Sequence, residues 1–130
     1  MNKLEAKLTV QWQKWAKAYL DHTCLWEIKV ARTHLFPFSA VKDHQIVALK
    51  AAGKKFIYKL SDANRVQMPC DGVTICNAPG YVVVIFYQPR KLKRFYMIEV
   101  SVFLDAQAKW PRKSLTAADC SDLAYKTGDL

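Results

Sequence analysis

The first twenty residues carry apolar side chains at helical spacing. These side chains recur every three or four positions, the period of an amphipathic helix, at Leu4, Leu8, Trp12, Trp15 and Tyr19. Lysines occupy another face of the same segment, at Lys3, Lys7, Lys14 and Lys17. We therefore expect a helix over residues 2–20, whose lysine face is either solvated or binds phosphate groups.

Strand patterns dominate the middle of the chain. Residues 24–31 alternate in polarity and are rich in strand-forming side chains, and a loop containing Pro37 follows them. Further strands are predicted over residues 55–60, 73–76, 81–87 and 95–100. The turn residues 77–80 connect two of these strands.

Helical segments are expected between and after the strands. Ser39 has the properties of an N-cap for a second helix that runs to Ala52 and stops at Gly53, with Gln45 on its inward face. A short helical turn is predicted over residues 101–107. A last short helix is predicted over residues 117–125, with Ser114 or Thr116 as its cap.

The order of these segments predicts the fold class. Helix, strand, helix and then a run of strands indicate an α/β protein with one mixed β-sheet flanked by helices. The length of 130 residues fits one compact domain over residues 1–130, and neither a repeat nor an interdomain linker is visible.

Charge narrows the class of partner. Twenty Lys and Arg residues against eleven Asp and Glu residues give a formal net charge of +9. A small domain with this excess of positive charge favours polyanions, above all nucleic acid. The sequence contains neither a secretory signal nor an apolar run long enough to span a membrane, so we expect a cytoplasmic protein without a membrane partner.

The cysteines do not predict a zinc site. Cys24, Cys70, Cys76 and Cys120 form no Cys-x-x-Cys pair, and the three histidines lie far from zinc-module spacings. In a reducing cytosol we expect all four to be free thiols.

Candidate chemistry centres on Glu27-Ile28-Lys29. The two-residue period of a strand places Glu27 and Lys29 on the same face of the sheet. Metal-assisted phosphodiester hydrolysis uses such a pair, because the carboxylate binds a divalent cation and the lysine orients water or stabilises phosphate charge. The alternative interpretation is an ion pair on an edge strand that contributes little to stability.

A hard cation such as Mg²⁺ favours more than one carboxylate ligand. We prefer Asp71 as the second metal ligand, because it opens a predicted strand and precedes Gly72. Asp21, just before the Glu27 strand, and Glu5, on the edge of the first helix, remain alternatives.

Three segments resemble a nuclease family. Trp26-Glu27-Ile28-Lys29, Phe36-Pro37-Phe38-Ser39 and Asp43-His44-Gln45-Ile46 resemble the core of RecU-type Holliday-junction resolvases and their phage relatives. The match covers about residues 24–60, and more loosely residues 95–100 and 112–114. The resemblance implies a restriction-endonuclease-like PD-(D/E)-x-K fold, a Mg²⁺ or Mn²⁺ cofactor, and a homodimer that binds branched DNA.

The resemblance also implies roles for individual residues. Glu27 would be a metal ligand, Lys29 the catalytic lysine, and Gln45 a neighbour of the site on the following helix. The chain departs from the family at the metal-binding aspartate, which usually lies on a separate strand upstream. Only Asp21 precedes Glu27 here, so Asp71 would enter the same site from a neighbouring strand.

Several basic clusters are candidates for DNA contact. Besides the lysines of the first helix, they comprise Lys54, Lys55 and Lys59, then Arg32, His34 and His44, and finally Arg90, Lys91, Lys93 and Arg94. No helix-turn-helix or zinc-finger pattern is present, so we expect recognition of backbone shape rather than base sequence.

Together these features predict a structure-selective DNA endonuclease without an organic cofactor. Alternatives are a nuclease of the same fold that acts on DNA ends or nicked duplex, a non-catalytic nucleic-acid-binding protein, and a module that binds an acidic protein. The apolar strand over residues 81–87 and surface exposure of Trp12 and Trp110 would supply the interface of a symmetric dimer.

Overall fold

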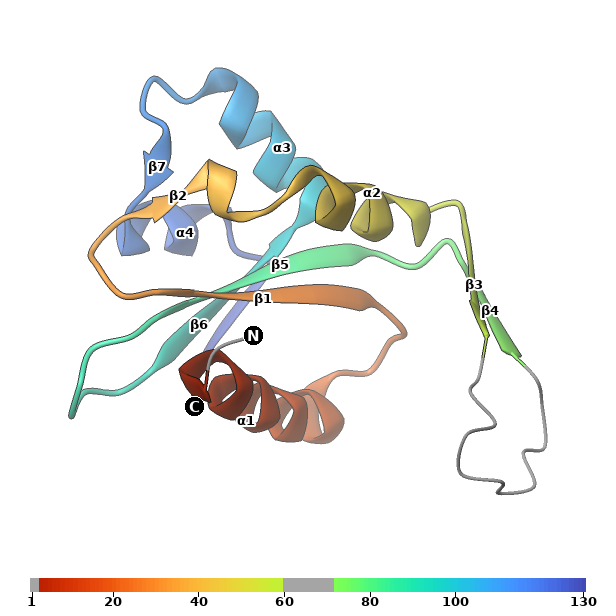
Figure 1. Ribbon diagram of the computed structural model, residues 1–130, viewed down its shortest axis with the longest axis horizontal. Helices are drawn as coiled ribbons and strands as arrows, with labels where there is room; N and C mark the ends of the chain where they lie inside the picture. Colours follow the sequence, from red (N-terminus) through yellow and green to blue (C-terminus); the bar gives the residue numbers. More distant parts are fainter. Residues whose placement is uncertain (1–2, 60–71) are drawn as a thin grey trace.

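The computed structural model describes residues 3–59 and 72–130, so Asp71 lies outside the described residues. The chain forms both helices and strands (Figure 1). In chain order they are α1 (Lys3–Tyr19), β1 (Leu25–Ala31), β2 (Phe36–Pro37), the 3₁₀ helix η1 (Phe38–Ala40), α2 (Asp43–Ala51), β3 (Lys55–Lys59), β4 (Gly72–Cys76), β5 (Gly80–Phe86), β6 (Arg94–Glu99), α3 (Val100–Lys109), β7 (Ser114–Leu115), α4 (Ala117–Leu123) and β8 (Lys126–Asp129).

A mixed four-stranded sheet in the order β1-β5-β6-β8 forms the centre of the fold. Strand β1 runs parallel to β5, with Glu27 opposite Val82, whereas β6 is antiparallel to both of its neighbours. Within the described residues, β1 is therefore an edge strand of this sheet. Strand β5 is a continuous apolar run because helices cover both of its faces.

Helices cover the two faces of the sheet unequally (Figure 1). Helix α1 packs on one face, where Leu8 and Trp12 meet Val83 and Phe95 in a buried cluster. Helices α2, α3 and α4 lie on the other face, over a second apolar cluster. The predicted α/β class, with a mixed sheet flanked by helices, is confirmed.

The β3–β4 hairpin connects α2 to the central strand. It extends away from the four-stranded sheet (Figure 1) and forms its own antiparallel pair. After the hairpin, Gly80 begins β5 directly against α2: a Cβ atom at this position would lie 2.4 Å from the carbonyl oxygen of Leu49. Only glycine allows the helix to approach this closely.

Three predicted helices have boundaries that differ from the structure by more than one residue. Helix α2 begins at Asp43 rather than after Ser39, because residues 38–40 turn as a 3₁₀ helix and Lys42 is the N-cap. Helix α3 has ten residues where a short turn was expected. Thr116 caps α4, one of the two caps predicted, but the helix ends at Leu123 because the chain then enters the unpredicted strand β8.

Two of the three features predicted to form a dimer interface are buried in the core of this chain. Trp12 is fully buried, because its indole packs against Trp15, Trp26 and Phe95 beneath the sheet. Trp110 is half-buried. Strand β5 lies between β1 and β6, so its apolar side chains form the core and are not available to a second copy.

Two further observations concern the predicted chemistry of the chain. Cys24, Cys76 and Cys120 are free thiols, as predicted; Cys70 lies outside the described residues. Across residues 3–59 and 72–130, none of the helices combines the length and apolar character needed to cross a membrane.

Candidate functional site

The edge strand β1 presents Glu27 and Lys29 on one face and Ile28 on the other. Ile28 belongs to the cluster beneath α1, so the two charged side chains face the α2 side of the sheet. Lys29 Nζ lies 3.6 Å from Glu27 Oε1, with the side chains 18% and 31% exposed respectively. This shielding makes the pair electrostatically stronger than a fully solvated surface pair.

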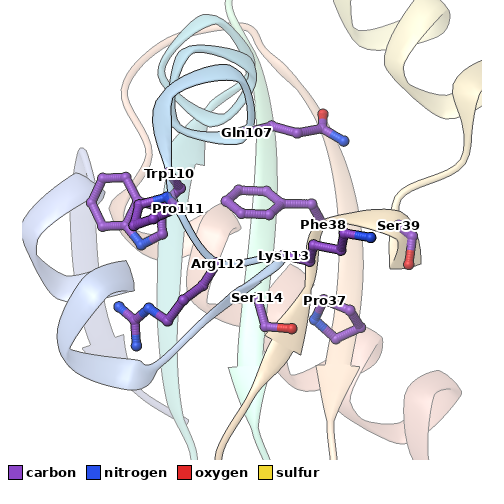
Figure 2. A pocket seen from close by; sticks show the side chains of 9 residues that line it. All are labelled: Pro37, Phe38, Ser39, Gln107, Trp110, Pro111, Arg112, Lys113 and Ser114. Atoms are coloured by element: carbon purple, nitrogen blue, oxygen red, sulfur yellow. The ribbon is translucent and has the colours of Figure 1, made fainter.

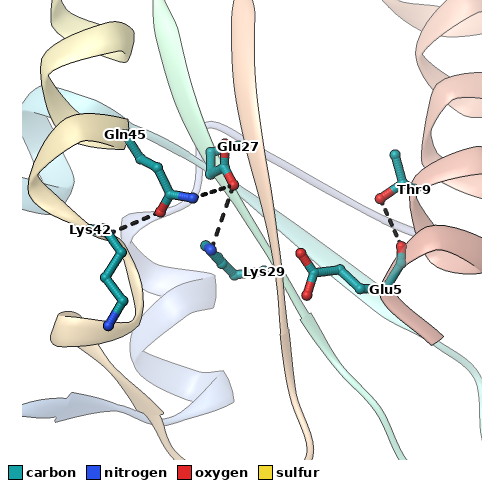
Figure 3. A network of polar contacts seen from close by, with 6 residues as sticks. All are labelled: Glu5, Thr9, Glu27, Lys29, Lys42 and Gln45. Carbon is teal, nitrogen blue, oxygen red and sulfur yellow. Dashed lines mark hydrogen bonds and ion pairs between the residues drawn. The ribbon is translucent and has the colours of Figure 1, made fainter. Parts of the chain in front are cut away.

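Gln45 links this pair to helix α2 (Figure 3). Its Nε2 donates a hydrogen bond to Glu27 Oε1 at 2.9 Å, and its Oε1 accepts one from the backbone N–H of Lys42 at 2.9 Å. The second bond is the returning half of a helix-capping arrangement, with Gln45 at the third helical position. Because the oxygen is occupied by the cap, the amide must present its nitrogen to Glu27.

Lys42 is the member of this network that sequence reasoning missed. The signal was available, since a glutamine three residues after a helix start is part of a known capping pattern. It was missed because the helix was predicted to begin at Ser39, whose side chain forms no hydrogen bond with another described residue.

A second acidic residue lines the same small cavity as Glu27. Glu5, from the first turn of α1, lines a small cavity of about 130 Å³ together with Thr9, Trp26, Glu27 and Ile28. Figure 3 shows the Glu5 carboxylate pointing from α1 toward β1. Two helices on opposite faces of the sheet thus contribute polar groups on either side of the edge strand.

The structure separates two of the three candidates for the second metal-binding carboxylate by their distance from the Glu27 cavity: Glu5 lines it and Asp21 does not. Asp21 has a side chain 92% exposed and pairs with His22 Nδ1 at 3.0 Å, a bond that is the main cause of its lowered pKa. Asp71, the preferred candidate, is outside the described residues, among which no group of three or more potential metal ligands occurs.

Glu27 and Lys29 can bind groups of opposite charge. Lys29 and Gln45 both contact Glu27 at Oε1, and Oε2 accepts no hydrogen bond from a described residue. A carboxylate oxygen in this state can accept a cation or a water proton. The Lys29 ammonium has donors beyond the one directed at Glu27, and these can bind an anionic oxygen.

Several of the predicted DNA-binding residues gather at one end of the sheet. Arg32 and His34 follow β1, and Arg90, Lys91 and Lys93 follow β5. Strands β1 and β5 are parallel, and Tyr87 N–H bonds to Ala31 O at 2.8 Å. Both groups of basic residues therefore lie at the same end of the sheet, beyond the carboxyl ends of these two strands. We call this region the basic strand end. Glu27 precedes Ala31 by four residues, or about 13 Å of strand.

The other predicted DNA-binding residues lie elsewhere. Arg94 begins β6 and pairs with Asp129, with Nε 3.0 Å from Oδ1. His44 is exposed on α2, and Lys54 and Lys55 are exposed after it. The four lysines of α1 are exposed, and α1 covers the face of the sheet opposite the one toward which Glu27 and Lys29 point.

A larger cavity of about 500 Å³ lies between residues 37–39 and the connection from α3 to β7 (Figure 2). Strand β2 pairs with β7 here, and Phe38 N–H bonds to Lys113 O at 3.1 Å. Arg112 donates to Asp119 Oδ2 at 2.8 Å. Two segments of the family resemblance, residues 36–39 and 112–114, are thus neighbours in space, although this cavity shares no lining residue with the one beside Glu27.

Comparison of the chain with protein-family models, with curated proteins and with solved structures gives no match.

Proposed function

We propose that this chain is a metal-dependent, structure-selective DNA endonuclease of the cytosol, a Holliday-junction resolvase with a restriction-endonuclease-like core. The observation that carries the proposal is the Glu27 carboxylate, which is contacted at one oxygen by both Lys29 and Gln45. A purely structural ion pair needs no helix-borne amide directed at the same oxygen. The resemblance of these three residues to the resolvase motif adds to this support.

The carboxylates beside the small cavity fit a hard divalent cation. Mg²⁺ takes oxygen ligands, retains several waters, and is commonly bound through one or two protein carboxylates together with substrate phosphates. Glu27 and Glu5 both line one cavity at the edge strand, which they approach from opposite faces of the sheet, and Asp71 is the further candidate. When bound, Mg²⁺ or Mn²⁺ would lower the pKa of a coordinated water and polarise the phosphate.

The residues of the chain would then have separate tasks. Glu27 would bind the cation through Oε2, because Gln45 donates its hydrogen bond to Oε1 and Lys29 also contacts that oxygen. Lys29 is positioned to stabilise the negative charge that develops on the phosphate oxygens as water attacks. Gln45 is a positioning residue, since it acts through the orientation of Glu27.

The basic strand end supports a branched DNA substrate. Its cations follow two adjacent strands, the first of which ends about 13 Å of strand beyond Glu27, so a DNA backbone bound there could extend to the carboxylate. These cations bind phosphates and do not distinguish base sequence, which fits a nuclease that recognises the shape of DNA. Cutting both strands of a junction symmetrically requires two active sites, and we therefore propose a homodimer.

The test compares cleavage of a labelled four-way junction and of the matching linear duplex, each with Mg²⁺, Mn²⁺ or EDTA. The variants are Glu27→Gln, Lys29→Met, Glu5→Gln and Asp71→Asn. Glu99→Gln is the matched control, because Glu99 is the remaining glutamate of the chain and lies exposed at the end of β6. DNA binding is measured alongside in EDTA.

Metal-dependent paired cuts in the junction that are lost in Glu27→Gln and Lys29→Met, but kept in Glu99→Gln, would support the proposal. Loss in Glu5→Gln or in Asp71→Asn identifies the second metal ligand. Equal cleavage of linear duplex would replace the resolvase with a nuclease that acts on DNA ends or nicks. Tight DNA binding without cleavage under any metal would leave a non-catalytic DNA-binding protein.

A further inference from the structure

The β5–β6 connection contains an unusual turn. Pro89 and Arg90 are its central residues, and Lys91 N–H bonds back to Gln88 O at 3.3 Å. Arg90 has φ of 63°, in the left-handed region. Proline followed by a residue of positive φ is the pattern of a type II turn, where glycine or asparagine is favoured at the second position. An arginine here accepts backbone strain that glycine would avoid.

Leu92 follows this turn and projects into solvent. It is 77% exposed, more than any other large apolar side chain in the described part of the chain. A single exposed leucine is ordinary on a protein surface. Leu92 differs because four cations surround it within five positions, at Arg90, Lys91, Lys93 and Arg94. Only Arg94 of these pairs with a described carboxylate.

The base of the connection is fixed on both sides of Leu92. The Lys93 ammonium lies 5.8 Å from the centre of the Tyr87 ring, and Lys93 O accepts the backbone N–H of Leu130 at 2.9 Å. Arg94 pairs with Asp129 in the adjacent register position. The backbone on either side of Leu92 is thus restrained before binding, which lowers the entropy cost of ordering this connection on DNA.

The position of Leu92 in the fold relates it to the proposed active site. The connection belongs to the basic strand end, which lies at the end of the sheet where β1 has its carboxyl end (Figure 1). DNA whose phosphates bind these cations would place its bases within reach of Leu92. Apolar side chains flanked by cations are the groups that proteins insert between base pairs, at the expense of base stacking.

We propose that Leu92 is an apolar wedge that inserts between bases of bound DNA, at the unstacked centre of a branched substrate. This inference rests on the DNA binding in the proposed function and adds the contact that separates branched from linear DNA. Bases are already partly unstacked at a branch point, so insertion there costs less than in continuous duplex. The cations bind phosphates of both substrates, whereas Leu92 contributes mainly to the branched one.

The test uses full-length protein in EDTA, with a four-way junction that carries a fluorescent adenine analogue at its centre. The emission of this analogue rises when it is unstacked. Leu92→Ala is compared with Leu92→Met, which keeps an apolar wedge, and with Val47→Ala. Val47 is 66% exposed on α2, away from the basic strand end, and is therefore a matched surface control. Unfolding temperature verifies that each variant is folded.

We expect Leu92→Ala to lose the emission rise and to bind the junction about tenfold more weakly, as the loss of most of a buried leucine side chain predicts. The dependence of affinity on salt should stay unchanged, because every phosphate-binding cation is kept. Affinity for linear duplex should also be unchanged. Leu92→Met and Val47→Ala should both behave like the wild type.

If the wild type binds the junction and Leu92→Ala retains both the affinity and the emission rise, the wedge is overturned. Cleavage by the wild type with Mg²⁺ is scored in separate samples. Binding with the emission rise but without cleavage would overturn the endonuclease and leave the wedge in place. Absence of DNA binding in the wild type would overturn both proposals.

Discussion

At the scale of single residues, the amide of Gln45 is the best-defined group near Glu27. Its two ends have different partners, the Lys42 backbone N–H and the Glu27 carboxylate. A donor and an acceptor are both required, so neither an acid nor an apolar side chain can replace the amide without loss. The local geometry therefore predicts a specific response to substitution.

We expect Gln45→Glu to destabilise the protein by about 1–2 kcal/mol near neutral pH, because two carboxylates would then face each other. Its deficit should shrink at about pH 5, since a proton shared by the pair restores a donor toward Glu27. Gln45→Met removes both hydrogen bonds without adding charge, so its deficit should not vary with pH. Urea unfolding at both pH values measures this, and parallel behaviour of the two variants would contradict it.

The sequence predicted the placement of a side chain where neighbouring residues determine it, and failed where residues distant in the chain determine it. Glu27 and Lys29 were expected on one face because the two-residue period of a strand is a local property, and the structure agrees. Trp12 was expected to be exposed, yet it is fully buried. The aromatic cluster that covers it includes Trp26 and Phe95, which only the folded chain brings to α1.

At the scale of elements, the capping of α4 gives a clear prediction. Thr116 Oγ1 accepts the Asp119 N–H at 3.2 Å, and Asp119 Oδ2 accepts the Thr116 N–H at 3.0 Å. The backbone hydrogen bond from Thr116 is the largest cause of the lowered pKa of Asp119, with a smaller contribution from Arg112. Stability due to a carboxylate with a lowered pKa is present above its unfolded pKa and is lost as pH falls through the folded value.

Asp119→Asn keeps an acceptor for the Thr116 N–H but removes the negative charge. We therefore expect it to destabilise the protein at about pH 6 and to cost less at about pH 3, which is below the unfolded pKa of about 3.9, so that part of the stability due to the ionised carboxylate is already lost. Thr116→Ala should cost about 1 kcal/mol at both pH values, because its hydroxyl does not titrate. Thermal unfolding at the two pH values distinguishes them, and a pH-independent cost for Asp119→Asn would contradict the argument.

Strand β8 shows why some elements could not be predicted. Residues 126–129 lack the alternating apolar pattern of a strand and form one because β6 offers a free edge. Asp129 pairs with Arg94, and Gly128 leaves room for Phe95, whose ring would lie 2.7 Å from a Cβ atom. Strand formation in such a segment is set by the neighbouring strand and not by its own sequence.

At the scale of the whole molecule, two of the predicted DNA-binding clusters lie on separate surfaces. The four lysines of α1 fall within an arc of about 80° on the helix, and Glu5 lies on nearly the opposite side of it. Glu5 borders the cavity beside Glu27, so the lysine face points away from that cavity. The basic strand end, by contrast, lies at the carboxyl ends of β1 and β5.

DNA bound with a phosphate at Glu27 should therefore contact the basic strand end and not the lysines of α1. We expect Arg90→Ala combined with Lys91→Ala to lower the slope of log affinity against log salt by about 1.8, or about 0.9 for each phosphate that the variant no longer neutralises. Lys14→Ala combined with Lys17→Ala removes the same net charge and should leave the slope unchanged, which makes it the matched control. Titration of duplex DNA at several salt concentrations measures both slopes.

The opposite result would be equally informative, because the two surfaces cannot both flank one phosphate at Glu27. A lower slope in the Lys14 and Lys17 variant alone would mean that DNA lies against α1, on the far side of the sheet from Lys29 and Gln45. In that case the Glu27–Lys29 pair would be a structural ion pair of the edge strand. Equal effects of both double variants would mean that DNA contacts both surfaces, which one duplex could do only by crossing the exposed edge of β1.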